Sequence, residues 1–141
     1  MKWQKILVVM VVCMLMMGMT MAVYAETGKA VGIQPRYTYT WSVEAGLQIS
    51  DSGVAQCQGG IGVYDESSTI SFKVSLYEKV DGSWERVTSW YDSCTGRDHL
   101  NISRTYQLTE YGRYKVLVTG TVTGADGGSE WISLESDQRT Y

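Results

Sequence analysis

The stretch ISFKVSLYEKVDGSWERVTSWY, residues 70–91, decides the fold of this chain. Apolar side chains occupy every second position from Ile70 to Leu76, which is the alternation of a β-strand with one buried face. The dipeptide Asp81-Gly82 that follows favours the left-handed backbone of a two-residue hairpin turn. The residues from Trp84 to Tyr91 then return as the partner strand. The stretch therefore predicts an antiparallel β-hairpin with one apolar and one polar face.

The length of the turn predicts which side chains face each other across this hairpin. With a two-residue loop, Val87 lies opposite Leu76 on the inward face. The outward face then carries three facing pairs, which are Trp84 with Lys79, Arg86 with Tyr77, and Trp90 with Lys73. This row of aromatic and cationic side chains is a candidate binding face. A three-residue loop would instead send both tryptophans into the core. Indoles that only cover their own sheet are a further interpretation.

Similar alternation, interrupted by Gly, Asp and Ser turns, continues along the rest of the chain. It predicts seven strands in one domain of residues 37–141, at 37–49, 55–63, 70–80, 84–91, 100–108, 114–122 and 131–134. The predicted fold class is all-β, an antiparallel β-sandwich. The glycines of CQGGIG, within the second segment, indicate a bulge. Residues 26–36 contain two glycines and the only proline, and we expect them to form a flexible lead-in.

The first 25 residues have the three parts of a secretory signal peptide. Lys2 and Lys5 form a basic n-region, residues 6–17 an apolar h-region, and Val23-Tyr24-Ala25 a cleavage signature. We therefore expect residues 1–25 to be removed and the protein to be secreted. The apolar run is nearly long enough to span a bilayer, so an outward-facing domain with an N-terminal membrane anchor is the alternative. Only an uncleaved segment would bring the chain to a membrane.

The charge of the chain limits its partners. The formal net charge is −3, and cleavage after Ala25 removes two of the 12 basic residues and none of the 15 acidic ones, which gives −5. An acidic balance disfavours nucleic acid and anionic membrane surfaces as partners.

Two cysteines remain after cleavage, Cys57 in a predicted strand and Cys94 in what looks like a polar turn. An even pair in an exported chain predicts a disulfide. Closing that loop would stabilise the fold by roughly 4 kcal/mol. Two free thiols are the alternative. A metal site is disfavoured because the chain has one histidine and no second cysteine pair, and we expect no metal and no other cofactor.

Candidate catalytic groups are few. His99 follows Asp98, but neighbours on a strand point to opposite faces, so Asp98 is poorly placed to orient the imidazole. The carboxylates lie in or near predicted turns, where acidic residues are common. The oxygen-rich loops at 65–68 and 125–130 match no ordered calcium-binding pattern. We therefore expect a protein that is not an enzyme.

The segment LTEYGRYKVLVTG, residues 108–120, resembles the corner and following strand of immunoglobulin-like and fibronectin-type domains. Tyr114 occupies the place of the corner tyrosine, whose hydroxyl bonds back to the backbone. Val116 stands where those domains have a cysteine. The motifs at 82–90 and 114–120 are similar to uncharacterised small secreted proteins of Gram-positive bacteria. The resemblance implies an immunoglobulin-like sandwich and a bacterial origin, and it implies no site residues.

Taken together, the residues predict a secreted, non-catalytic β-sandwich that binds a surface. The expected partner is a cell-wall glycan or an extracellular protein, since Tyr and Trp combine an apolar body with a polar tip. A small secreted effector, antimicrobial or toxin-like, is the alternative function.

Overall fold

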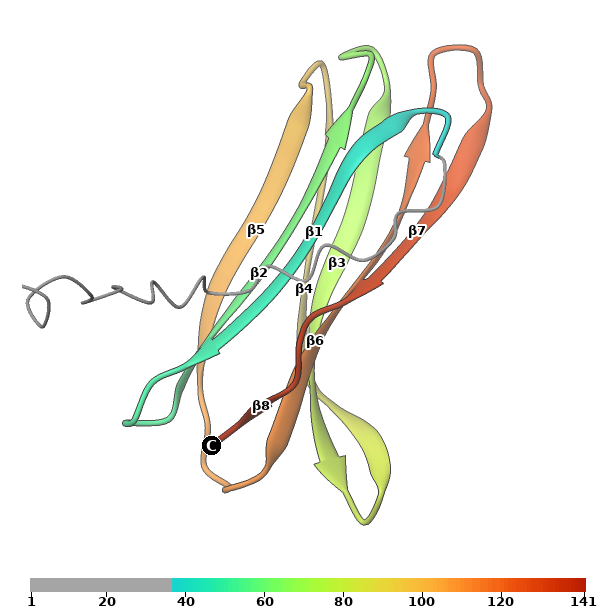
Figure 1. The fold of residues 1–141 in the computed structure, drawn as a ribbon. Helices are drawn as coiled ribbons and strands as arrows, with labels where there is room; N and C mark the ends of the chain where they lie inside the picture. Colours follow the sequence, from blue (N-terminus) through green and yellow to red (C-terminus); the bar gives the residue numbers. More distant parts are fainter. Residues whose placement is uncertain (1–36) are drawn as a thin grey trace, which may run out of the picture.

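Strands fill most of the chain that the structure describes, residues 37–141 of a computed structural model (Figure 1). They are β1 (Thr40–Ile49), β2 (Val54–Val63), β3 (Thr69–Val80), β4 (Ser83–Thr95), β5 (His99–Gln107), β6 (Arg113–Thr123), β7 (Ser129–Glu135) and β8 (Arg139–Thr140). Within these residues no helix is long and apolar enough to cross a membrane. The predicted signal peptide (1–25) and lead-in (26–36) lie outside the described residues.

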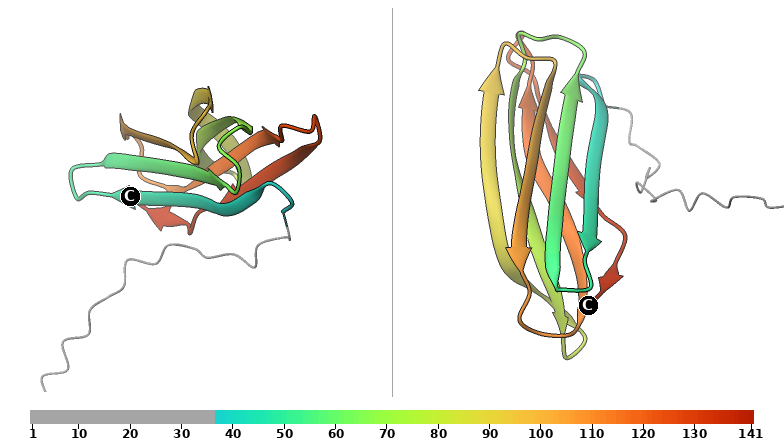
Figure 2. Two further views of the ribbon diagram at one scale, coloured as in Figure 1. Left: turned by 90° about the horizontal axis from the view of Figure 1, so that it is seen from above. Right: turned by 90° about the vertical axis from the view of Figure 1, so that its left-hand side faces the viewer.

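The strands form two antiparallel sheets that lie face to face as two layers (Figure 2). Sheet A has the strand order β1-β2-β5, and sheet B has the order β4-β3-β6-β7 with β8 paired to β6. The all-β, antiparallel prediction is confirmed. The seven predicted segments correspond to β1 to β7. Strand β8 was not predicted, because two residues are too few to show an alternation.

The core lies between the sheets and is built from alternate residues of each strand. On β3, Ile70, Phe72, Val74 and Leu76 are at most 1% exposed. Gly59 of β2 faces Val74, and a Cβ added at Gly59 would come within 2.5 Å of a methyl carbon of that valine. The register between β1 and β2 shifts between Thr40 and Ser42, opposite Val63 and Gly62, so the extra residue lies on β1 and the bulge predicted within β2 is wrong. The lack of a side chain at Gly59 lets the two sheets approach.

The Asp81-Gly82 turn has the predicted conformation. Its two central residues have φ angles of 50° and 86°. A two-residue turn with both φ angles positive matches the right-handed twist of the strands that it joins. Val80 accordingly pairs with Ser83, as the sequence predicts.

The corner tyrosine also forms as predicted. The Tyr114 hydroxyl donates to the carbonyl oxygen of Glu110 at 2.7 Å and lies 3.1 Å from a Glu78 carboxylate oxygen. Burial, and then the Glu78 carboxylate, raise the pKa of Tyr114 to about 12. The hydroxyl therefore stays protonated and keeps its role as a donor, which ties the start of β6 to the preceding loop.

The predicted Cys57–Cys94 disulfide is absent, and both thiols are free. Cys94 does not lie in a turn, because β4 continues to Thr95. It lies near the β2–β3 connection, since the Gly96 N–H two residues on donates to the carbonyl of Glu66. Cys57 is six residues back along β2 from Val63, or about 20 Å at the rise of a strand. A disulfide needs Cα atoms within about 7 Å of each other.

We expect a reducing agent to leave the thermal midpoint of the domain unchanged, because no covalent link joins the sheets. Differential scanning calorimetry with and without dithiothreitol checks this. Burial raises the pKa of the Cys57 thiol to about 12. The half-buried Cys94 should therefore react first with a thiol reagent. A thermal midpoint that falls when dithiothreitol is added would show that Cys57 and Cys94 do form a disulfide in solution.

Val116 tests the assignment of strand faces. Its side chain is fully buried on β6, so Val116→Asp places an unpaired charge in the core and should cost about 4 kcal/mol or more, most of the stability of a small domain. Thr121→Asp, on the outward face of the same strand, is the matched control and should change the stability by less than about 1 kcal/mol. Chemical denaturation of both variants measures the difference.

Candidate functional site

The hairpin of β3 and β4 places five of the six predicted face residues on the outer surface of sheet B. Lys79 pairs with Trp84, and Tyr77 pairs with Arg86, as predicted. Lys73 lies on the same surface, because it alternates with the buried residues Phe72 and Val74. Five of the six residues therefore share the outward face, and one does not.

Trp90 does not belong to this face. A β-bulge between Leu76 and Tyr77 inserts Val87 as an extra residue on β4, so that Leu76 pairs with Thr88 instead of Val87. Every later pair shifts by one position, and Trp90 lies opposite the inward-facing Val74, where it packs partly buried against the core. A shift of one residue moves each side chain of a strand to the other face.

Tyr91 takes the predicted place of Trp90. It pairs with Lys73 and is 69% exposed. On the opposite edge of sheet B, Trp131 of β7 is 64% exposed and pairs with Thr121 of β6. The alternation of Trp131 with the buried Ile132 was the available sequence signal for an outward indole. Nothing in the sequence marked Tyr91, because no residue signals the bulge.

A shallow groove of about 230 Å³ crosses β3 and β6 between these two rings. Its lining comprises Ser71, Phe72, Lys73, Tyr91, Thr119, Gly120, Thr121 and Trp131. Its exposed lining is mainly apolar, because the Thr119 hydroxyl is buried and the Ser71 hydroxyl is bonded to Ser93. Lys73 is its only charged lining residue. We call the outer surface of sheet B that contains this groove, together with Tyr77, Lys79, Trp84 and Arg86, the B face.

At the hairpin end of the B face, Trp84 covers an ion pair. The Lys115 ammonium lies 4.5 Å from the centre of the indole ring and 2.6 Å from a carboxylate oxygen of Glu135. The Lys79 ammonium lies 5.7 Å from the same ring. These contacts hold the half-buried Trp84 flat against its own sheet, so this indole is less available to a ligand than Tyr91 or Trp131.

Cations dominate the B face although the chain as a whole is acidic. Lys115 is neutralised by Glu135. Lys73, Lys79 and Arg86 form no salt bridge with any residue of 37–141. The face therefore carries three uncompensated positive charges along β3 and β4.

Hydroxyl pairs form the rest of the B face near the groove. Thr69 and Thr95 have their Oγ1 atoms 2.8 Å apart, and the hydroxyls of Ser71 and Ser93 lie 2.6 Å apart. Each pair spans β3 and β4. Because serine and threonine side chains are short, the rings of Tyr91 and Trp131 project further from the sheet than the residues between them.

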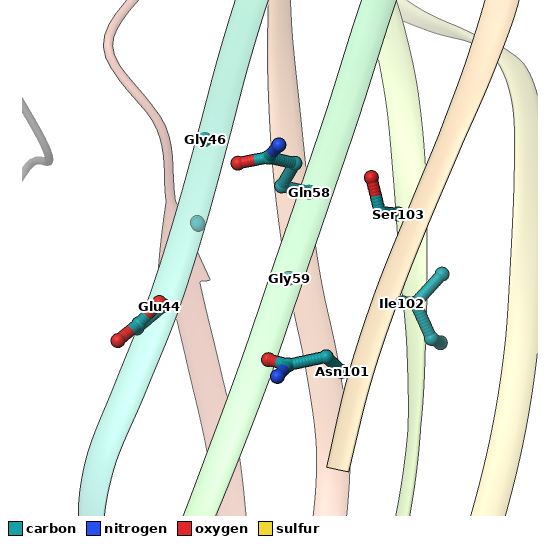
Figure 3. Close-up of a pocket in the computed structure, with 8 residues that line it drawn as sticks. Glu44, Gly46, Gln58, Gly59, Asn101, Ile102 and Ser103 are labelled. Carbon is teal, nitrogen blue, oxygen red and sulfur yellow. The ribbon is translucent and has the colours of Figure 1, made fainter. Parts of the chain in front are cut away.

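The outer surface of sheet A has a different site, which we call the A furrow (Figure 3). It has a volume of about 290 Å³ and is lined by Glu44, Ala45, Gly46, Gln58, Gly59, Asn101, Ile102 and Ser103. The Gln58 side chain points toward Gly46, and the Asn101 side chain points toward β2. Ala45 and Ile102 bury their side chains in the core and contribute backbone to the floor.

His99 borders this region and contacts Asn101 and Trp41. Its Nδ1 lies 3.0 Å from the Asn101 amide nitrogen, and its ring stacks on Trp41 with centroids 6.3 Å apart. The backbone carbonyl of Asp98 accepts from the N–H of Val63. These contacts give His99 a packing role on the surface of sheet A.

The acidic loop at 125–130 binds the residues just before β1. Both Asp126 carboxylate oxygens accept from the Tyr39 hydroxyl at 2.9 Å, and Glu130 accepts from the backbone N–H groups of Thr38 and Tyr39. Across residues 37–141, no three His, Cys, Asp or Glu residues gather where they could hold a metal ion. The loop oxygens instead hold two segments of the fold together.

Comparisons with known proteins do not assign either surface. No protein-family model matches the chain, and a search of curated proteins found no significant match.

The Tyr39–Asp126 contact should make stability depend on pH in the acid range. The Gly128 N–H, and then the Tyr39 hydroxyl, lower the pKa of Asp126 below its ordinary 3.8. A lowered folded-state pKa stabilises the fold above the unfolded pKa, and this contribution is lost as pH falls through the folded value. Tyr39→Phe should therefore raise the pKa of Asp126, measured by NMR titration of the carboxyl carbon.

Asp65 is the control for this titration. Its pKa is also lowered, but by the Ser67 hydroxyl and N–H, which do not depend on Tyr39. Its titration should be unchanged in Tyr39→Phe. If Asp126 also titrates unchanged, the tyrosine is not a donor to it in solution.

Proposed function

We propose that this chain is an exported, immunoglobulin-like β-sandwich that acts without catalysis and binds an extracellular polysaccharide on its B face. The observation that carries the proposal is the groove between Tyr91 and Trp131. Aromatic rings on either side of a mainly apolar floor suit a sugar chain, since the rings can stack on apolar faces of sugars while Lys73 and the Thr121 hydroxyl bond to sugar hydroxyls.

The dimensions of the groove favour a chain over a single sugar. Tyr91 is on β4 and Trp131 on β7, three strand spacings apart in the order β4-β3-β6-β7. At about 4.8 Å per spacing, the two strands are about 14 Å apart. A ligand that contacts both rings must span this width, which requires several linked units.

Charge favours an anionic chain. Lys73 lies inside the groove, and the uncompensated Lys79 and Arg86 extend the positive surface toward the hairpin. A polymer that carries carboxylate or phosphate groups would be attracted to this face, while the net negative charge of the chain disfavours such polymers elsewhere. Acidic cell-wall glycans have this chemistry.

The test is a binding assay with acidic and neutral polysaccharides, with polygalacturonate and cellulose as the two probes. We expect binding of the acidic probe that weakens as salt rises. Tyr91→Ala with Trp131→Ala should lower affinity at least about tenfold, because each exposed ring contributes about 1–2 kcal/mol when covered. Lys73→Ala should weaken binding of the acidic probe alone.

Tyr64→Ala with Tyr111→Ala is the matched control. Both tyrosines are exposed and lie outside the groove lining, so their removal should leave binding intact. Equal loss in both double variants would show that the aromatic contacts are unspecific. If neither probe nor isolated cell walls bind the folded wild type, the glycan proposal is wrong.

A further inference from the structure

We propose that the A furrow is a second ligand site, and that it binds a single uncharged sugar ring. It lies on the outer surface of sheet A, the opposite side of the sandwich from the B face. The proposal depends on its own residues and stands or falls separately from the polysaccharide site.

Gly46 gives the furrow its space. The register aligns it with Gln58 on β2 and places Ser103 next in the same row on β5. A Cβ built at Gly46 would touch only Gln58, at 3.7 Å, which is ordinary contact. The position could therefore hold a side chain, and its absence leaves a depression between two strands. A glycine within a strand often marks the close approach of a ligand.

A second glycine places the hydrogen-bonding groups. Gly60 pairs with Asn101, and the Asn101 side chain lies over the glycine, in space that a Cβ would occupy. The His99 contact at 3.0 Å holds the Asn101 amide from the other side. A fixed amide loses little freedom when it binds a ligand.

The lining chemistry fits sugar hydroxyls. Gln58 and Asn101 each offer an amide that donates and accepts, and Ser103 adds a hydroxyl that does both. Sugar hydroxyls also donate and accept, so each can pair with such a group. The lining contains no lysine, arginine or histidine, so it offers no cation to pair with an anionic ligand.

The size of the furrow suits one sugar ring. Its volume of about 290 Å³ is at the lower end of the range of about 300–1,000 Å³ for ligand pockets. The B face and the A furrow therefore differ in both respects, since one suits a long anionic chain and the other a small neutral unit.

The experiment is an NMR titration of the folded, isotope-labelled protein with glucose, galactose and N-acetylglucosamine, and with glucuronate as the anionic comparison. We expect backbone amide shifts at residues 46, 58–60 and 101–103, with at least one neutral sugar binding at a Kd of about 1 mM. Glucuronate should bind at least about tenfold more weakly.

Gly46→Val should weaken the bound sugar at least about tenfold by filling the furrow. Gln48→Val is the matched control, because it adds the same side chain to the same face of β1 outside the lining, and it should leave binding unchanged. If Gly46→Val does not fold, Asn101→Ala replaces it in the test and should also weaken sugar binding at least about tenfold. The proposal is overturned if no neutral sugar shifts the furrow amides, if shifts occur only around Tyr91 and Trp131, or if the furrow variants bind as the wild type does.

Discussion

The inner row of β3, from Ile70 to Leu76, packs against sheet A, and the positions of the other strands depend on this contact. Val74, at its centre, meets Gly59 of β2, where the missing side chain lets the sheets approach closely. β3 is also paired on both sides, with β4 and β6. Because apolar burial is the main stabilising term in folding, the strand cannot turn over without exposing its inner row. That constraint also fixes the outer row, so Lys73 and Tyr77 must face solvent.

A single extra residue then decides which aromatic side chains reach that outer surface. With the two-residue turn alone, Trp90 would lie on the B face; the bulge at Val87 sends it inward and brings Tyr91 out. The exchange suits both surfaces. The large indole adds apolar contact to the rim of the core, and the phenol presents a polar tip to water. The set of side chains on the B face therefore depends on backbone register as much as on composition.

The two outer surfaces of the sandwich have separate chemistries. The B face carries the uncompensated cations Lys73, Lys79 and Arg86 beside exposed rings, while Glu44 is the only charged residue in the lining of the A furrow. About 10 Å of packed core separates two face-to-face sheets, so neither surface contributes side chains to the other. A ligand on one surface leaves the other accessible, which would allow the protein to bridge two molecules.

Local pattern alone predicted β1 to β7 and the two-residue turn, because alternation and Asp81-Gly82 act over a few residues. The corner tyrosine followed from the resemblance of residues 108–120 to immunoglobulin-like domains. Local pattern also placed the cationic part of the B face, since a strand has a period of two, but it placed neither ring of the groove on that face. Only the tertiary structure decided the rest. The bulge at Val87 satisfies packing between sheets, Cys57 and Cys94 lie too far apart to bond, and the A furrow joins three strands distant in sequence. Each of these depends on which strands become neighbours, and no local stretch of sequence records that.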